Sequence, residues 1–318
     1  MLQLFYGEAM KKILLPLFTI GVILLIVINI NPISSYLASF LEDKKDVVIL
    51  PSNEYTKNID YLYVQRTDDY VPYSYQDLLN IIYSVLNNGW DSFTFYCPSE
   101  YLDCLKDFKA ITDDKNILTH INNYVHPFNS FNNIKTSYDD SGEVNLEINK
   151  LYAKNDILTI SLKVDNILAE VIASEMTTED KILAIHDYVI NHSKYDEARN
   201  DDEETSYTSN TAYGPLIQGY SVCGGYADAM AIFLYKLNIN NFKVASEKHV
   251  WNAVNLDNQW LHLDLTWDDP LSSDGSDKLW HTYFLVTSNE LINIDVGIED
   301  VINHTFDNSI YLEFNEAT

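Results

Sequence analysis

The sequence is short of positive charge and of the residues that mark several special protein classes. Lys and Arg number 20 in 318 residues against 47 Asp and Glu, which gives a formal net charge of −27. A surface this acidic repels phosphate backbones, so nucleic acid is not an expected partner. The counts of Gly, 10, and Pro, 8, are too low for a fibrous or low-complexity chain. We interpret the acidity as a contribution to solubility.

Cysteine is scarce as well. Three cysteines are too few for a disulfide scaffold, and an odd number leaves at least one thiol free. Cys97 and Cys104 are seven residues apart. On one helix their Cα atoms would be about 10 Å apart, which is too far for a disulfide. Pro98 favours a loop at Cys97, which would permit a disulfide, and the alternative is two small buried apolar side chains.

Motifs for cofactors and metals are missing from the sequence. It contains no P-loop, no Rossmann glycine pattern and no EF-hand loop. His186 lies in a predicted helix that has no second histidine or cysteine at ligand spacing. We therefore expect no cofactor and no metal site.

The N-terminal residues contain a long apolar run. Residues 13–30 read ILLPLFTIGVILLIVINI, and these 18 uncharged residues would span about 27 Å as a helix, enough for a bilayer core. Lys11 and Lys12 precede the run, which predicts an N-terminus inside and the remaining chain outside. We expect residues 1–45 to be an uncleaved signal anchor and stalk of a single-pass cell-membrane protein. The alternative is a secreted protein released by signal cleavage.

The hydrophobic content of 47% allows two modest domains after the anchor. Residues 46–165 are predicted to be a small α/β domain of unknown role. Its helix begins at the capping sequence Ser74-Tyr75-Gln76-Asp77 and ends at Gly89. A second helix is expected at residues 113–124. The expected strands are residues 47–50, 61–65, 93–96 and a hairpin strand in which Val144, Leu146 and Ile148 alternate with polar residues.

The third cysteine, Cys223, lies at the predicted start of an apolar helix that runs to about residue 237. Two further helices, around residues 157–172 and 177–190, precede it. Unpaired N–H groups and the helix dipole stabilise a thiolate at a helix N-terminus. Gly224 and Gly225 let another backbone or a substrate approach closely. A buried, inert thiol is the alternative interpretation.

A β-hairpin is expected after this helix. Residues 248–254 and 259–267 are strand-like, and Asp257-Asn258 suits the turn between them. With this turn His249 and Asp264 lie on the same face as diagonal neighbours. A slip of one residue in register would separate them.

Thiolate, imidazole and carboxylate together make a complete nucleophilic set. Cys223 would attack an acyl carbonyl, and its backbone N–H would help to stabilise the oxyanion. His249 would hold the thiolate as an ion pair and protonate the leaving amine. Asp264 would orient the imidazole ring and stabilise its charge.

Three motifs together resemble the bacterial transglutaminase-like superfamily: Cys-Gly-Gly-Tyr-Ala, His-Val-Trp-Asn and Trp-Leu-His-Leu-Asp-Leu-Thr-Trp-Asp-Asp-Pro. The helix from Lys181 and residues 280–285 are similar to the lead-in helix and closing strand of that domain. The resemblance covers roughly residues 170–290. It implies an α+β, papain-like fold, with the nucleophile helix packed on an antiparallel sheet, in a domain of residues 166–318. It also assigns the Cys-His-Asp triad to Cys223, His249 and Asp264.

The resemblance has departures and leaves several residues open. Members of the family often have Gln or Glu where Gly224 stands. Gln218, five residues before the nucleophile, is a candidate oxyanion donor or a surface amide. His262 would be a polar neighbour of the triad. The candidates for a substrate groove, which would otherwise be core residues, are Trp251, Trp267 and Tyr226.

The resemblance implies a surface-tethered, cysteine-dependent amide-bond enzyme that acts on protein or peptide substrates by acyl transfer or proteolysis. One alternative is a catalytically idle binding or scaffold domain on the same frame. Another is a cell-wall peptide amidase of a related papain-like family, which shares the Cys and His but lacks the His-x-Trp-Asn and Asp-x-Thr-Trp motifs.

Overall fold

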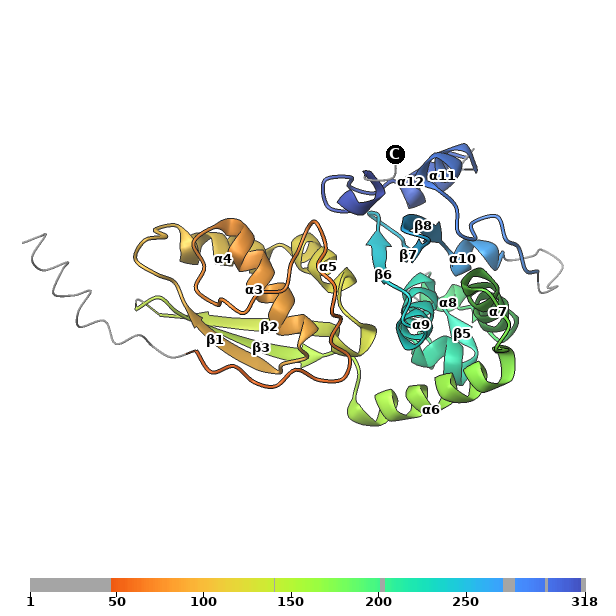
Figure 1. Cartoon of the computed structure of the whole chain (residues 1–318), viewed down its shortest axis with the longest axis horizontal. Coiled ribbons are helices and arrows are strands. Elements are labelled where there is room, and N and C mark those ends of the chain that lie inside the picture. The colour runs from red at the N-terminus through yellow and green to blue at the C-terminus, as the bar shows by residue number, and fades with distance from the viewer. Residues whose placement is uncertain (1–46, 140, 201–203, 271–277, 295–296, 316–318) are drawn as a thin grey trace, which may run out of the picture. The chain divides into compact units, whose positions relative to one another are not determined.

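The computed structural model describes residues 47–139, 141–200, 204–270, 278–294 and 297–315. The expected membrane segment, residues 13–30, lies outside these ranges. Within the described ranges, no helix combines the length and the apolar character needed to cross a membrane. Residues 48–318 form one compact unit of mixed α/β structure, and the division expected at residue 165 stays a prediction (Figure 1).

The N-terminal part of this unit is a three-stranded antiparallel sheet with helices packed on it (Figure 1). The strand order is β1-β3-β2, and the alternating residues Val144, Leu146 and Ile148 of β3 are buried as expected. Ser74 caps the first helix by accepting a hydrogen bond from the Asp77 N–H. The elements are α3 (Tyr75–Asn87), β1 (Ser92–Tyr96), α4 (Cys104–Asp113), α5 (Lys115–Asn123), the 3-10 helix η1 (Pro127–Asn129), β2 (Phe131–Tyr138) and β3 (Glu143–Lys150).

Two of the strands expected in this part are wrong. Residues 47–50 and 61–65 are described but form no strand. The extended chain around them runs along α3 instead, where side chains of that helix accept its backbone hydrogen bonds. Lys57 N–H donates to Asn87 Oδ1 at 3.0 Å, and Gln65 N–H donates to Asn80 Oδ1 at 2.9 Å. These amides replace the neighbouring strand that a sheet would need.

Cys97 and Cys104 form a disulfide, with their Cα atoms 5.7 Å apart. Cys97 follows the last residue of β1, whereas Cys104 is the first residue of α4. The two cysteines are therefore not on one helix, and the loop that contains Pro98 returns the chain to bonding distance.

Replacing both cysteines with Ser should lower the free energy of unfolding by about 2–3 kcal/mol, because the unfolded chain loses a short covalent loop. Urea unfolding of the full chain, with and without a reductant, measures this change. Reductant should destabilise the wild type and leave the double variant unchanged. Equal stability of the two proteins without reductant would contradict the prediction.

The C-terminal part surrounds one apolar helix. Helix α9 (Cys223–Lys236) is buried along most of its length and packs against β6, β7 and α7. Helix α7 begins with a capping box between Thr177 and Asp180, at the position where the sequence predicted a helix to begin. The other main elements are α6 (Lys154–Val171), α7 (Thr178–Asn191), and the antiparallel strands β6 (Asn241–Ala245), β7 (Val250–Leu256) and β8 (Gln259–Leu263).

Short helices and strands connect these longer elements and complete the C-terminal part. In chain order they are β4 (Lys194–Tyr195), α8 (Glu197–Asn200), the π-helix η2 (Gly214–Gln218), β5 (Tyr220–Ser221), α10 (Leu265–Asp268), α11 (Ser288–Ile294), α12 (Ile298–His304) and the 3-10 helix η3 (Leu312–Asn315).

The predicted hairpin register is confirmed, but the strand ends earlier than expected. Asn252 pairs with Leu263 and Leu256 pairs with Gln259, so the turn is at Asp257-Asn258. The strand β8 ends at Leu263, and the chain turns into the one-turn helix α10.

Residues 280–285 do not form the expected closing strand. The helix α10 binds this segment instead, because the backbone carbonyl of Asp268 accepts from Trp280 N–H and its side chain accepts from Tyr283 N–H. A single antiparallel bridge between His262 and Val286 follows.

Candidate active site

Cys223 is the first residue of α9 and carries a free, half-buried thiol. The N–H of the preceding residue, Val222, donates to Ser209 O at 2.9 Å, so the chain at residues 209–210 lies across the start of the helix. This leaves the thiol at the positive end of a helix dipole, where an anion is favoured.

Gly224 and Gly225 allow that close approach. A Cβ atom at Gly225 would lie 2.3 Å from Ser209 O, and one at Gly224 would lie 3.0 Å from Asn210 O. The first contact excludes any larger side chain unless the backbone shifts. The second contact is tight, so a larger residue directly after the thiol would require the chain at Asn210 to shift by a few tenths of an ångström.

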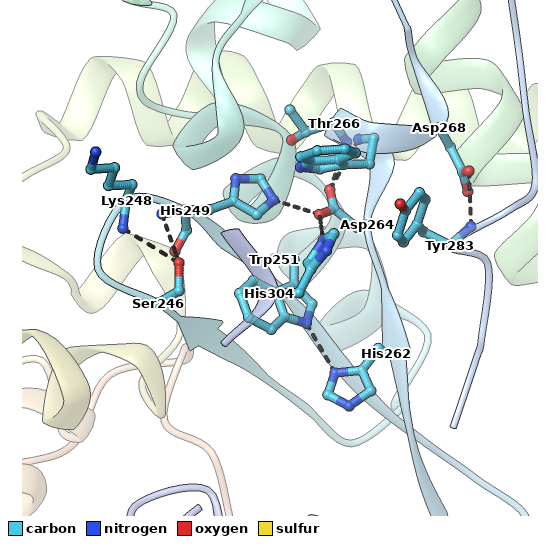
Figure 2. Close-up of polar contacts among 11 residues, drawn as sticks. Ser246, Lys248, His249, Trp251, His262, Asp264, Thr266, Asp268, Tyr283 and His304 are labelled. Atoms are coloured by element: carbon cyan, nitrogen blue, oxygen red, sulfur yellow. Dashed lines mark hydrogen bonds and ion pairs between the residues drawn. The ribbon is translucent and has the colours of Figure 1, made fainter. Parts of the chain in front are cut away.

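His249 lies immediately before β7 and is buried. Its Nε2 atom is 2.5 Å from Asp264 Oδ2 (Figure 2), and interaction with the Cys223 side chain contributes to the raised pKa of the ring. Because Asp264 occupies Nε2, Nδ1 is the ring nitrogen left for the thiol. The proximity that the hairpin register predicted for His249 and Asp264 is therefore observed, while their catalytic roles stay a prediction.

Two other residues of the His-Val-Trp-Asn motif hold His249 in place. The indole of Trp251 stacks on the His249 ring, with 5.6 Å between the ring centroids. Asn252 donates from Nδ2 to Ala227 O at 2.9 Å, which ties the hairpin to the helix that carries Cys223. The motif thus sets the distance between imidazole and thiol.

Asp264 uses both carboxylate oxygens. Oδ1 accepts from the backbone N–H groups of Thr266 and Trp267, as the cap of α10. Oδ2 faces His249 and also the Nε2 atom of His304, at 3.0 Å (Figure 2). These contacts hold the carboxylate in one orientation. The sequence suggested a continuing strand here and did not reveal the cap.

Sequence reasoning also missed His304. This residue ends α12 and is buried, and its ring packs against those of Tyr283 and Trp267. It lies 40 residues beyond Asp264 and outside the segment covered by the resemblance. No spacing or motif in the sequence indicates it, since only the folding back of the C-terminal segment brings it to the carboxylate.

His249 and Asp264 each stabilise the charged form of the other. Burial alone would lower the pKa of His249, but the Asp264 carboxylate and Cys223 outweigh burial and raise this pKa to about 10. Burial would raise the pKa of Asp264, but His249 and His304 lower it well below its usual value. At neutral pH the pair is therefore imidazolium and carboxylate.

A cavity of about 720 Å³ opens beside Cys223 and His249. Trp267 lines it, as expected for a groove residue. The charged groups on its wall are Lys248 and Asp269. The further lining residues are Tyr195, Thr266, Pro270, Trp280, Thr282, Tyr283, Ile294 and Asn303.

Three of the other candidate residues do not line this cavity. Trp251 is buried under His249, and Tyr226 is buried with its hydroxyl bonded to Asp269. They are core residues, because the nucleophile helix and the hairpin close over them. Gln218, the oxyanion candidate, is the last residue of η2, and its Oε1 accepts from Thr208 N–H at 2.7 Å. It is not among the described residues that line the cavity.

His262 has a structural environment. It accepts from the Trp251 indole N–H at Nδ1 and lies 3.0 Å from Ser288 Oγ at Nε2. Burial and the neighbouring His304 lower its pKa to about 3, so the ring is neutral. His262 therefore holds the Trp251 indole by a hydrogen bond. Among the described residues, no hydrogen bond joins it to Asp264.

Comparison with known proteins agrees with this geometry. Residues 165–265 match the transglutaminase-like superfamily. This segment of the chain is therefore a transglutaminase-like domain, and Cys223, His249 and Asp264 lie within it. No curated protein matches the sequence.

One solved structure is similar in part. Its title is "Crystal structure of a TGase", and the match covers 46% of this chain and 48% of that chain, at 15% sequence identity and a TM-score of 0.34. The match thus spans about half the length of that protein.

Asp264→Asn should lower the pKa of His249 from about 10 toward its ordinary value of ~6.5, because the carboxylate then no longer opposes burial and only Cys223 still raises this pKa. The Asn oxygen can still cap α10, so the fold is retained. NMR titration of the His249 ring measures the change, and at pH 7.5 the ring should be charged in the wild type and neutral in the variant. Asp257→Asn, in the exposed turn of the same hairpin, is the matched control. A His249 pKa that stays near 10 in Asp264→Asn would refute the electrostatic account.

His304→Ala should lower the free energy of unfolding by about 2–3 kcal/mol, because it removes a donor to a buried carboxylate and leaves a void between aromatic rings. Urea unfolding measures this loss. His192→Ala is the control, since His192 is exposed and bonds only a local backbone carbonyl among the described residues. A change within ~0.5 kcal/mol for both variants would show that His304 is not needed.

Proposed function

We propose that this chain is a cysteine-dependent amide-bond enzyme with Cys223 as nucleophile, His249 as acid and base, and Asp264 as the group that orients the imidazole. One observation carries the proposal: the His249 imidazole is bonded to a buried carboxylate and lines the same cavity as a free thiol at a helix N-terminus. A domain with idle chemistry has no need of a histidine held in this state.

The reaction would begin with attack of Cys223 Sγ on the carbonyl carbon of an amide. The Cys223 N–H at the start of α9 would stabilise the negative oxygen of the tetrahedral intermediate. His249 would then give its Nδ1 proton to the leaving nitrogen as the C–N bond breaks, which leaves a thioester on Cys223 and a free amine.

Water or a second amine would resolve the thioester, with His249 taking a proton from the attacking group. Water gives hydrolysis, and an amine gives a new amide bond. The aromatic and charged walls of the cavity suit a peptide segment, so we propose protein or peptide substrates. A cell-wall peptide is one such substrate class.

We further propose that residues 13–30 anchor the enzyme in the cell membrane, with the described residues outside. The disulfide between Cys97 and Cys104 supports this location, since such bonds persist in oxidising compartments. A secreted form released by signal cleavage would agree with the same disulfide.

Alkylation of Cys223 by iodoacetamide tests the proposal directly. In the unreduced full chain Cys97 and Cys104 are bonded, so Cys223 is the reactive thiol. We expect rapid alkylation at pH 6, and a loss of roughly 100-fold in rate in His249→Ala, because an unpaired thiol is ionised to less than about 1% at that pH. Mass spectrometry locates the adduct, and His192→Ala is the matched control.

An active ester separates an enzyme from an idle scaffold. Incubation with 4-nitrophenyl acetate should place an acetyl group on Cys223, and added amine should shorten the lifetime of that adduct if transfer competes with hydrolysis. Two results together would refute the enzyme proposal and favour a binding domain. They are slow alkylation at pH 6 with the same rate in His249→Ala, and no acetyl adduct.

A further inference from the structure

We propose that His186, Asp187 and His281 form a binding site for a zinc-type divalent cation, on the outer side of the cavity wall. Their ligand atoms, His186 Nδ1, Asp187 Oδ1 and His281 Nε2, all lie within 4.8 Å of one another. The Asp187 oxygen is 2.9 Å from the first nitrogen and 2.8 Å from the second. This site is separate from Cys223, and its binding of metal does not depend on the proposed catalysis.

Both ring nitrogens of His186 face carboxylate oxygens. Its Nδ1 faces the Asp187 carboxylate, and its Nε2 faces Asp268 Oδ2 at 3.2 Å. A neutral imidazole carries one proton, so one of the two nitrogens would turn its lone pair toward a carboxylate oxygen. His281 then directs a further nitrogen at the same Asp187 oxygen. A second proton on the ring would satisfy both carboxylates, and so would a metal ion at Nδ1, for which the nearby His281 nitrogen supplies a further ligand.

Metal-binding histidines usually donate their other ring N–H to a carboxylate or a carbonyl, and Asp268 is placed to accept from His186 in this way. An Nε2–H donated to Asp268 would hold His186 in the tautomer whose Nδ1 lone pair is free for a metal. Asp268 is itself buried, and its other oxygen accepts from Tyr283 N–H at 3.0 Å. The carboxylate–histidine arrangement is therefore built into the core, beneath the proposed ion.

The three ligands suit zinc better than calcium or magnesium. Two imidazoles and one carboxylate favour zinc and its neighbours, whereas calcium and magnesium prefer oxygen ligands. Tetrahedral ligands of zinc lie roughly 3.3 Å apart, a few tenths of an ångström more than the present spacing. The side chains of His281 and Asp187 are 43% and 35% exposed, so they can open by this amount and leave a fourth position for water.

The ion would connect helix α7 to the wall of the cavity. His281 lies between Trp280 and Thr282, and both of these line the cavity beside Cys223. A metal held by His186, Asp187 and His281 would fix this segment in place. The sequence did not suggest the site, because its second histidine is 94 residues away from Asp187.

Zinc titration by calorimetry tests the proposal, on the full chain with Cys223→Ala so that zinc cannot bind the thiol. We expect one equivalent of zinc to bind, and its affinity to fall by at least roughly 100-fold in His281→Ala and in Asp187→Asn. His192→Ala, which removes another exposed histidine near the end of the same helix, should bind zinc as the parent does. Circular dichroism checks that each variant is folded.

Cobalt(II) gives a second readout. Its visible absorption should report a four-coordinate site in the Cys223→Ala chain and should disappear in His281→Ala. Absence of zinc binding in the Cys223→Ala chain would overturn the proposal. So would binding that His281→Ala and Asp187→Asn leave unchanged, or that His192→Ala abolishes equally. Because the thiol is absent throughout, these outcomes are independent of whether the chain is an enzyme.

Discussion

The buried carboxylate of Asp264 is the constraint on which the site depends. Removing a carboxylate from water costs several kcal/mol, and only well-aimed donors can offset that cost. Two backbone N–H groups of α10 and two imidazoles supply them. These four donors come from three parts of the structure, so the charge draws the hairpin, the one-turn helix and the end of α12 to one point. The raised pKa of His249 follows from the same charge.

Asp268 has a similar role at the other end of α10. It binds the backbone of residues 280–283 with its carbonyl and one carboxylate oxygen, and it reaches His186 of α7 with the other. The wall of the cavity is therefore held by a buried carboxylate and not by a strand ladder. Asp264 and Asp268 begin and end the same helix, α10, which explains why one turn of helix interrupts a strand-like sequence at this position.

Local patterns in the sequence predicted much of the frame. The capping sequences at Ser74 and Thr177 and the turn at Asp257-Asn258 depend on neighbouring residues, so the helices and the hairpin register could be read from them. The strands expected at residues 47–50 and 61–65 were wrong because short apolar runs also occur in extended chain outside a sheet. Residues 48–50 are exposed, and the chain at residue 65 is bonded to α3. The groove roles expected for Trp251 and Tyr226 were wrong because an aromatic side chain gives the same pattern whether it is buried or exposed.

The sequence by itself determined which residue types are available and where the local elements begin: a thiol before an apolar helix, a histidine and a carboxylate on one hairpin, and the motifs of a transglutaminase-like domain. Only the tertiary structure decided that His304 reaches Asp264, that Cys97 meets Cys104, and that His281 meets His186. Hydrogen bonds and packing within a few residues leave a periodic signal in the chain. Contacts between segments tens of residues apart depend on how the whole unit buries its apolar surface, and no local pattern records them.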